Sequence, residues 1–235
     1  MRSDAYFPCA LAHTSGRRSA YRPTSVHRLR PGDIQVIASL GDSLSAGLGA
    51  LARSEFQLLV ENRGVAWSGG KNILTVFALV RETGILHAHY FFPAGGLGNW
   101  KEYTTLPNIL KNFNPKIYGY STRNVLFKRE KSIDAFNVAV SGATSGDLPA
   151  QAKRLIQRMR QDRRVNYTQG WKMVTIMIGG NDGCSHVCES LSKRRMDASP
   201  SAFIKNLRRT LDILQRDMPR TFINLVPTPG MMNPR

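Results

Sequence analysis

Residues 34–44 read IQVIASLGDSL, an apolar run followed directly by a polar turn. A short apolar run that is rich in β-branched residues and bounded by turn residues predicts a strand buried on both faces. The turn places the hydroxyl of Ser43 at the carboxyl end of this strand, where reacting groups gather in open α/β sheets. Ser43 is therefore a candidate nucleophile. Glycine, aspartate and serine are also ordinary turn residues, so the motif alone does not separate a catalytic turn from a structural one.

Three further apolar runs predict buried strands, at residues 135–140, 173–178 and 221–226. Amphipathic segments lie between them. One begins at Leu148, and another begins at Pro200 behind a predicted Ser199 N-cap. Continuous apolar strands that alternate with amphipathic helices are typical of a mostly parallel sheet covered on both faces. The sequence therefore predicts the α/β class, and within it a three-layer α/β/α sandwich.

The chain has 235 residues, which fits one α/β domain. Residues 1–30 are rich in arginine, serine, proline and threonine and show no periodicity that would bury a face. We expect a flexible basic arm there, followed by a single domain over residues 31–235. No apolar stretch is long enough to cross a bilayer, and the first residues do not form a signal peptide as written.

The formal net charge of +17 arises from 33 Lys and Arg against 16 Asp and Glu. Such an excess indicates nucleic acid or an anionic membrane surface as a partner, or a missing acidic portion of the protein. The basic residues are scattered along the chain, and neither an aromatic-interleaved basic motif nor zinc-finger spacing accompanies them. We therefore expect mainly solvated basic faces, with an anionic membrane surface as a partner and no nucleic acid.

Two other predicted strands run into small polar turns that match the one at Ser43. These turns contain Gly142 and Asn181. In a parallel sheet all three turns emerge at the same edge, so we expect them to meet. Acyl transfer needs a nucleophilic hydroxyl and hydrogen-bond donors aimed at the developing oxyanion. Ser43 supplies the hydroxyl, while the Gly142 backbone N–H, the Asn181 amide and the Ser43 N–H can supply the donors.

These turns, in this order, resemble those of the GDSL, or SGNH, hydrolase family, whose fold is flavodoxin-like. Longer blocks narrow the resemblance to the animal phospholipases B of the membrane-associated kind. Those blocks are residues 41–49, 61–68, 104–110 with 113–115, 137–143, 147–152 and 171–182. The resemblance implies Ser43 as the nucleophile of an acyl-serine intermediate and Gly142 and Asn181 as the oxyanion hole. It also implies phospholipid or lysophospholipid substrates, no cofactor, and an extracellular or membrane-associated ectodomain.

The family's last block, an Asp-x-x-His that supplies the general base and its orienting carboxylate, has no counterpart in this chain. None of the five histidines has an aspartate three residues before it. Without a base the serine keeps the high pKa of an alcohol, so we expect weak or absent turnover from this polypeptide. His186 is the only candidate for a substitute base. The alternative is a non-catalytic relative that binds lipid or membrane.

Residues 71–95 interrupt the resemblance, because family members pass almost directly from the block at 61–70 to Gly98-Asn99-Trp100. One interpretation is a surface loop specific to this lineage. The other is an unspliced, in-frame intron, because the codons that can encode both ends of the insert are compatible with splice sites. Residues 230–235 allow the same interpretation. We expect an atypical insert at 71–95 in either case.

Cys184 and Cys188 are close enough in sequence to form a small loop disulfide. A metal site with His186 is the alternative, but zinc needs four ligands and no second pair lies nearby, so no metal is expected. Asn166, in Asn166-Tyr167-Thr168, is the single N-glycosylation acceptor sequence.

Overall fold

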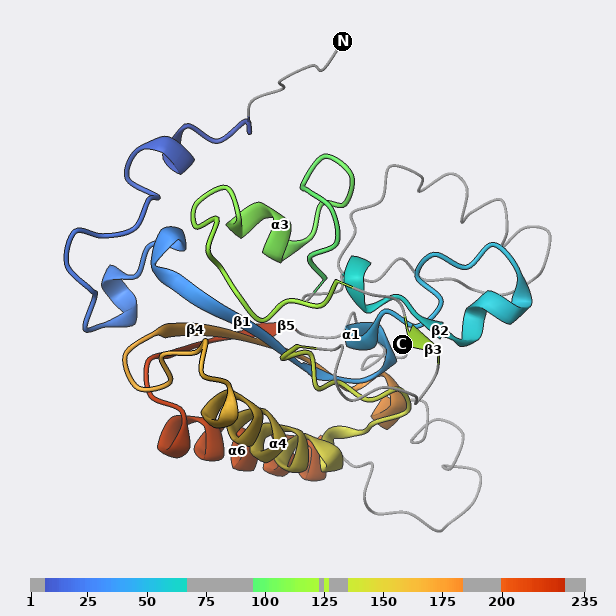
Figure 1. Ribbon diagram of the computed structural model, residues 1–235. Helices are drawn as coiled ribbons and strands as arrows, with labels where there is room; N and C mark the ends of the chain where they lie inside the picture. Colours follow the sequence, from blue (N-terminus) through green and yellow to red (C-terminus); the bar gives the residue numbers. More distant parts are fainter. Residues whose placement is uncertain (1–6, 67–94, 123–124, 127–134, 184–199, 227–235) are drawn as a thin grey trace, which may run out of the picture.

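The computed structural model describes residues 7–66, 95–122, 125–126, 135–183 and 200–226 (Figure 1). Its central sheet has the order β1-β4-β5, and both strand pairs are parallel. The strands are β1 (Ile34–Gly41), β4 (Trp171–Met177) and β5 (Thr221–Val226). β2 (Val60–Glu61) and β3 (Val125–Leu126) form a separate antiparallel pair. Three of the four apolar runs are thus confirmed as strands of one parallel sheet.

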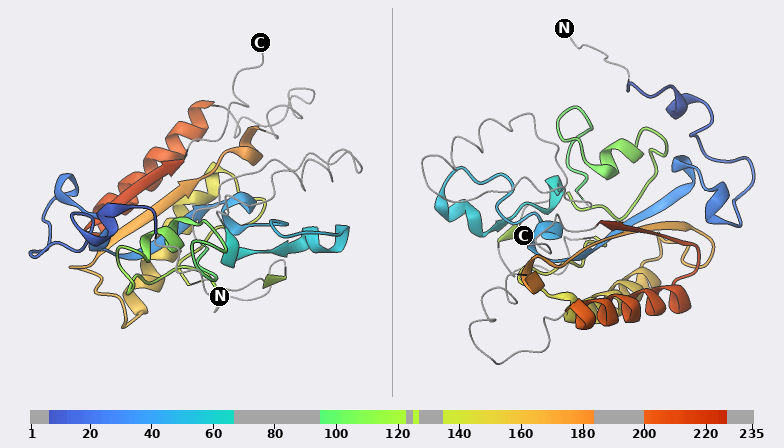
Figure 2. Two further views of the ribbon diagram at one scale, coloured as in Figure 1. Left: turned by 90° about the horizontal axis from the view of Figure 1, so that it is seen from above. Right: turned by 180° about the vertical axis from the view of Figure 1, so that it is seen from behind.

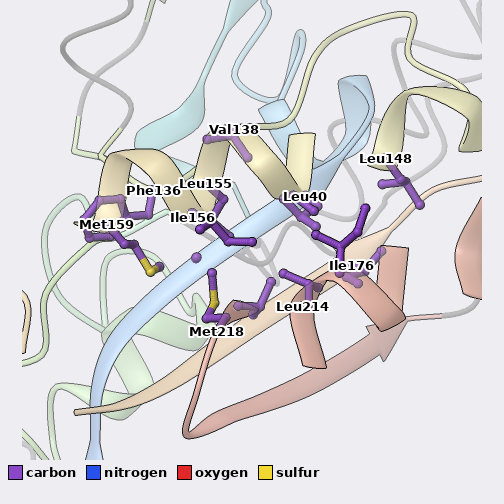
Figure 3. Packing of buried hydrophobic residues seen from close by; sticks show 14 of the residues in the cluster. Leu40, Phe136, Val138, Leu148, Leu155, Ile156, Met159, Ile176, Leu214 and Met218 are labelled. Atoms are coloured by element: carbon purple, nitrogen blue, oxygen red, sulfur yellow. The ribbon is translucent and has the colours of Figure 1, made fainter. Parts of the chain in front are cut away.

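Two long helices cover one face of the sheet, as expected. α4 (Leu148–Gln161) and α6 (Pro200–Asp217) lie side by side beneath it (Figures 1 and 2). Alternate β1 residues point into the core that these helices close, which is drawn in Figure 3. Its fully buried side chains include Leu40, Leu148, Leu155, Met159, Ile176 and Leu214. Burial of this apolar layer is the main force that fixes both helices on the sheet.

The opposite face carries the third layer. Its core joins Ile34, Ile37 and Met173 of the sheet to Leu110 of the short helix α3 (Leu106–Leu110). The rest of this face is covered by irregular chain and short 3-10 turns, so the layer is thinner than the α4 and α6 layer (Figure 1). The 3-10 turns of the described chain are η1 (Ala10–His13), η2 (Val26–Arg28), η3 (Pro31–Asp33), η4 (Glu55–Leu59), η5 (Arg63–Val65) and η6 (Ser145–Asp147), of which η6 lies instead beside α4 and α6. The three-layer α/β/α architecture is confirmed.

The fourth predicted strand, residues 135–140, is not a regular strand. It lies beside β1, where the Ser39 N–H donates to the Phe136 carbonyl and the Val138 N–H donates to the Ser39 carbonyl, but only one bridge pair, Ser39 with Asn137, is formed. A regular parallel ladder would next use the Gly41 N–H, but this donor binds the Gln151 side-chain oxygen instead, over 2.8 Å. On the side away from β1, the Ala139 N–H donates to the Asn137 Oδ1. Apolar periodicity did not reveal these side-chain partners.

Residues 7–30, where we expected a flexible arm, contact the domain at several points. The Trp171 indole N–H donates a hydrogen bond to the Pro23 carbonyl over 2.8 Å, and Arg220 donates to the same oxygen over 2.7 Å. The Ser19 hydroxyl donates to the Asp33 carboxylate over 2.8 Å. The sequence lacked an apolar face here, but polar groups provide these contacts instead.

The insert at 71–95 lies outside the described residues apart from Gly95, and its flanks meet. The Gly95 N–H donates to the Ala66 carbonyl over 2.9 Å, and the Leu97 N–H donates to the Gly64 carbonyl over 2.8 Å. The chain therefore leaves and re-enters the domain at one place. Within the part of the chain that the structure describes, no helix has the length and apolarity needed to span a membrane.

Candidate active site

Ser43 is the first residue of α1 (Ser43–Ala46), the short helix that follows β1. Asp42 caps this helix by accepting the Leu44 N–H over 2.9 Å. A Cβ on Gly41, whose φ is +150°, would come within 2.2 Å of the Met177 carbonyl oxygen, so only glycine fits the turn. Ser43 itself is half-buried. The local sequence therefore places the serine at a tight strand-to-helix turn.

The end of β1 is fixed by a side chain that sequence reasoning did not identify. Gln151 of α4 is buried, and its amide hydrogen-bonds both the N–H and the carbonyl of Gly41, each over 2.8 Å. A glutamine amide can replace a neighbouring strand in this way, because it carries one donor and one acceptor. Gln151 lies within a block that carried the family resemblance, yet nothing in that block indicated its partner.

Asn181 emerges beside Ser43. β1 and β4 are neighbours, with Gly41 opposite Met177, and residues 180–183 form the first turn of a helix directly after β4. The Asn181 Nδ2 donates to the Ala143 carbonyl over 2.8 Å. Next to it, the Asp182 carboxylate accepts the Ser145 N–H at 2.9 and 3.1 Å. The turn after β4 is therefore joined to the turn that contains Gly142.

Gly142 lies at an exposed turn with φ of +84°. A Cβ placed on it would meet nothing within 4 Å, so the residue faces open space at the sheet edge. Its backbone N–H makes no hydrogen bond to any residue that the structure describes. The preceding Val140 N–H donates to the Gly41 carbonyl over 3.1 Å, which holds this turn against the end of β1. A free amide hydrogen beside the Ser43 turn is the group that an oxyanion hole requires.

A buried ion pair connects these turns. Arg63 donates to the Glu61 Oε2 at 2.7 and 2.9 Å, and both side chains are nearly inaccessible to solvent. Arg63 also donates to two carbonyls of the 137–140 segment, at 3.0 and 3.1 Å. The second Glu61 oxygen, Oε1, accepts the Ser141 hydroxyl over 2.6 Å. The pair thus fixes the backbone immediately before Gly142, as a buried charge pair can when its remaining hydrogen-bonding groups are satisfied.

Sequence reasoning missed this ion pair. Glu61 and Arg63 lie within the block at 61–68, which supports the family resemblance but whose residues had no expected role. Two charged residues separated by one position are usually solvated, so no local signal indicated burial. The Glu-x-Arg spacing inside an otherwise buried stretch was the available sign of a buried ion pair.

Asp42 has an unusual electrostatic environment. Burial raises its pKa to about 6, opposed by the Leu44 backbone hydrogen bond and reinforced by the nearby Asp182 carboxylate. Its Oδ2 is buried and has no hydrogen-bond partner among the described residues. The Gly180 backbone lies next to this oxygen, because a Cβ on Gly180 would be 3.7 Å from it. A carboxyl whose pKa is raised by burial therefore lies next to Ser43 in the serine turn.

The remaining candidate residues are two cysteines, a histidine and an asparagine. Cys184, Cys188 and His186 fall outside the described residues, so the disulfide and the substitute base stay predictions. Asn166 is exposed in the turn between α4 and β4, at the opposite edge of the sheet from Ser43, and its glycosylation also stays a prediction. Among the residues that the structure describes, no cluster of three or more histidine, cysteine, aspartate or glutamate side chains could hold a metal ion.

Comparison with known proteins supports the resemblance that the sequence blocks indicated. The family model for the GDSL-like lipase/acylhydrolases matches residues 37–234. The mouse protein "Phospholipase B1, membrane-associated" is 39% identical over 205 residues, which are 86% of this chain and 12% of the mouse protein. The human protein of the same name is 40% identical over 211 residues, 88% of this chain and 12% of the human protein. The chain thus spans only 12% of the length of these curated relatives.

Proposed function

Because this chain belongs to the GDSL-like lipase/acylhydrolase family, we propose that its sheet edge at Ser43 is a site for hydrolysis of fatty-acyl esters. The observation that carries the proposal is the junction of the three turns. The turns after β1 and β4 follow paired strands, and the Asn181 side chain is hydrogen-bonded to the residue after Gly142. A hydroxyl and two kinds of amide donor thereby share one edge.

In the proposed reaction the Ser43 oxygen attacks the ester carbonyl and loses its proton to a base. The Gly142 N–H and the second N–H of the Asn181 amide stabilise the negative charge on the tetrahedral oxygen. Collapse expels the alcohol, which takes up a proton, and leaves the acyl group on Ser43. Water then attacks this acyl-serine and releases the fatty acid. Each oxyanion donor is worth about 2.7–4 kcal/mol in related sites, so both turns contribute substantially to the rate.

The proposed substrates are phospholipids and lysophospholipids. The support is the identity of 39–40% to proteins named phospholipase B1. Those relatives are named as membrane-associated, and the net charge of +17 suits an anionic membrane surface. We therefore propose that this chain meets its substrate at a membrane.

The proposed reaction needs a proton acceptor, and the family's histidine has no counterpart in this polypeptide. None of its five histidines follows an aspartate at the family spacing. We infer that the 235-residue chain turns over esters slowly or not at all. The same observation favours a second candidate function, a non-catalytic relative that binds lipid.

A test with an external base separates the two candidates. Turnover of a short-chain p-nitrophenyl ester would be measured with and without added imidazole, for the parent chain and for Ser43→Ala. A hydrolase that lacks only its base is expected to gain turnover with imidazole, and Ser43→Ala is expected to show none of that gain. Ser54→Ala, an exposed serine in the loop after α1, is the matched control. Absence of any Ser43-dependent gain favours the lipid-binding relative.

Two further results would correct parts of the proposal. Asn181→Ala should lower the imidazole-dependent rate by about 10²–10³-fold if the amide is an oxyanion donor. Robust turnover without imidazole, abolished by Ser43→Ala, would contradict the inferred loss of the base and reveal a base elsewhere in the chain.

A further inference from the structure

An exposed apolar loop follows the nucleophile turn. Phe56 is 88% exposed, Leu59 is 60% exposed and Leu51 is 38% exposed. The part of the chain that the structure describes has nine exposed large hydrophobic side chains. Three of these side chains lie between residues 51 and 59. Single exposed apolar residues are ordinary, whereas a group of them on one loop marks an interaction surface. We call residues 49–59 the apolar loop.

The base of the apolar loop is held by hydrogen bonds on both sides. The Gly49 N–H donates to the Val60 carbonyl over 2.8 Å, and the Asn62 N–H donates to the Gly47 carbonyl over 2.8 Å. The Asn62 Oδ1 accepts the Leu51 N–H over 2.9 Å. We call residues 47–48 and 60–62 the stem of the loop, and these hydrogen bonds fix the loop on its stem. Figure 2 shows the loop extending away from the sheet beside α1.

The stem also connects the apolar loop to the candidate active site. The Leu48 N–H donates to the Ser43 carbonyl over 3.0 Å. On the other strand of the stem, Glu61 accepts the hydroxyl of Ser141, the residue before Gly142. The exposed apolar side chains are therefore carried by the element that lies between the nucleophile turn and the Gly142 turn.

The charges on the loop favour a lipid surface as its partner. Arg53 and Glu55 are exposed and offset one another, so the loop is close to neutral and its contact area is apolar. The chain as a whole carries +17, which attracts it to an anionic surface at long range. An apolar loop on a strongly basic domain matches a phospholipid surface, whose headgroups are anionic and whose interior is hydrocarbon.

We propose that the apolar loop inserts Phe56 and Leu59 into the surface of a phospholipid bilayer or micelle, with Leu51 at its edge. Insertion would hold the Ser43 edge of the sheet next to the acyl esters of the lipid. The use of that position for hydrolysis rests on the proposed function, whereas the insertion does not, because it needs no catalytic base. The partner of the loop is thus a phospholipid surface and not a second copy of the chain or a peptide.

Tryptophan placed on the loop reports insertion directly. The Phe56→Trp variant would be mixed with vesicles of phosphatidylcholine and phosphatidylserine whose acyl chains carry bromine. About 20% of the lipid would be the anionic phosphatidylserine. We expect quenching of the added tryptophan beyond that of the parent chain. Tyr21→Trp is the matched control, because Tyr21 is 90% exposed and lies on the N-terminal segment. It should show no added quenching.

Loss of the apolar side chains should weaken binding. Phe56→Ser and Leu59→Ser are each expected to lower vesicle affinity by about tenfold or more, since each removes an inserted apolar group, and Tyr21→Ser should leave it unchanged. Both loop residues are exposed, so the variants should fold, which thermal unfolding checks. Residual binding should persist in moderate salt because insertion is not electrostatic.

Several outcomes would overturn the proposal. Equal quenching of the two tryptophan variants would remove the loop from the contact. Vesicle binding that high salt abolishes and Phe56→Ser leaves intact would assign binding to charge alone. A chain that sediments as a dimer, which Phe56→Ser converts to a monomer without vesicle binding, would assign the loop to self-association. Failure of the proposed hydrolysis is separate, because it would appear as absent Ser43-dependent turnover alongside intact insertion.

Discussion

The Ser141 hydroxyl donates a 2.6 Å hydrogen bond to the Glu61 Oε1. This bond joins the residue before Gly142 to the second strand of the stem that begins at the Ser43 turn. The other Glu61 oxygen is held by Arg63, which also binds two carbonyls of the 137–140 segment. The turn that carries the proposed oxyanion donor is therefore positioned by these side chains as well as by the backbone hydrogen bond from Val140 to Gly41.

Ser141→Ala should loosen the Gly142 turn. The substitution leaves one oxygen of a buried carboxylate without a donor, so we expect a loss of about 1–3 kcal/mol in the free energy of unfolding. Urea unfolding measures this loss. Amide hydrogen exchange at Ala143, whose N–H donates to the Val140 carbonyl over 3.0 Å, should also accelerate, and it would distinguish local loosening from global destabilisation. Ser54→Ala, on the exposed apolar loop, is the control. Unchanged exchange at Ala143 would contradict a positioning role.

Arg63→Met should destabilise the fold strongly. It leaves the buried Glu61 carboxylate and two buried carbonyls without their donor, a change that costs about 3–5 kcal/mol in comparable buried pairs. Arg216→Met is the control, because its ion pair with Asp217 is exposed, and the free energy of unfolding should barely change. Glu61→Gln added to Arg63→Met should recover part of the loss. Urea unfolding of the parent chain and these three variants would show whether it does.

Asp42 should make stability depend on pH. Its pKa rises from 3.8 to about 6 on folding, chiefly through burial, so the unfolded chain ionises first as pH increases. The free energy of unfolding is then highest below pH 3.8 with respect to this group, and it falls as pH rises through about 6. The full loss is about 3 kcal/mol at about 1.4 kcal/mol per pKa unit.

Asp42→Asn should remove this dependence while the side chain still caps α1, since asparagine is an equally good N-cap. Urea unfolding across pH 4.5–7.5, a range of roughly three units about the raised pKa, provides the comparison. The stability of Asp42→Asn relative to the parent chain should increase with pH. Parallel curves for the two proteins would show that Asp42 ionises as readily in the folded protein as in the unfolded chain.

Deletion of residues 71–94 should leave a folded domain. Gly95 and Ala66 are already hydrogen-bonded over 2.9 Å, so residues 67–70 are enough to join the flanks. A shorter connection loses less entropy on closure, and we expect the free energy of unfolding to stay constant or rise by up to about 2 kcal/mol. Thermal and urea unfolding test this. Loss of a cooperative transition would mean that the insert is part of the fold.

The elements that follow from local pattern were predictable. Apolar runs predicted β1, β4 and β5, and amphipathic periodicity predicted α4 and α6, because burial of a continuous face requires those periods. The same reasoning failed at residues 135–140, which are equally apolar. There the Gln151 side chain binds the Gly41 N–H, a donor that a regular ladder with residues 135–140 would have used.

The candidate nucleophile and its partners show the same division. The glycine and polar residues after each apolar run could be read from the sequence. Parallel pairing of the strands explains why the turns that contain them share one edge. The sequence therefore specified the layers, the strands and the residue types at the Ser43 edge, since these depend on local spacing. The fold alone determined that Gln151 would bind Gly41, that Glu61 and Arg63 would be buried, and that Phe56 would be exposed. A buried polar group is tolerated only when a partner reaches it, and these partners come from distant parts of the chain.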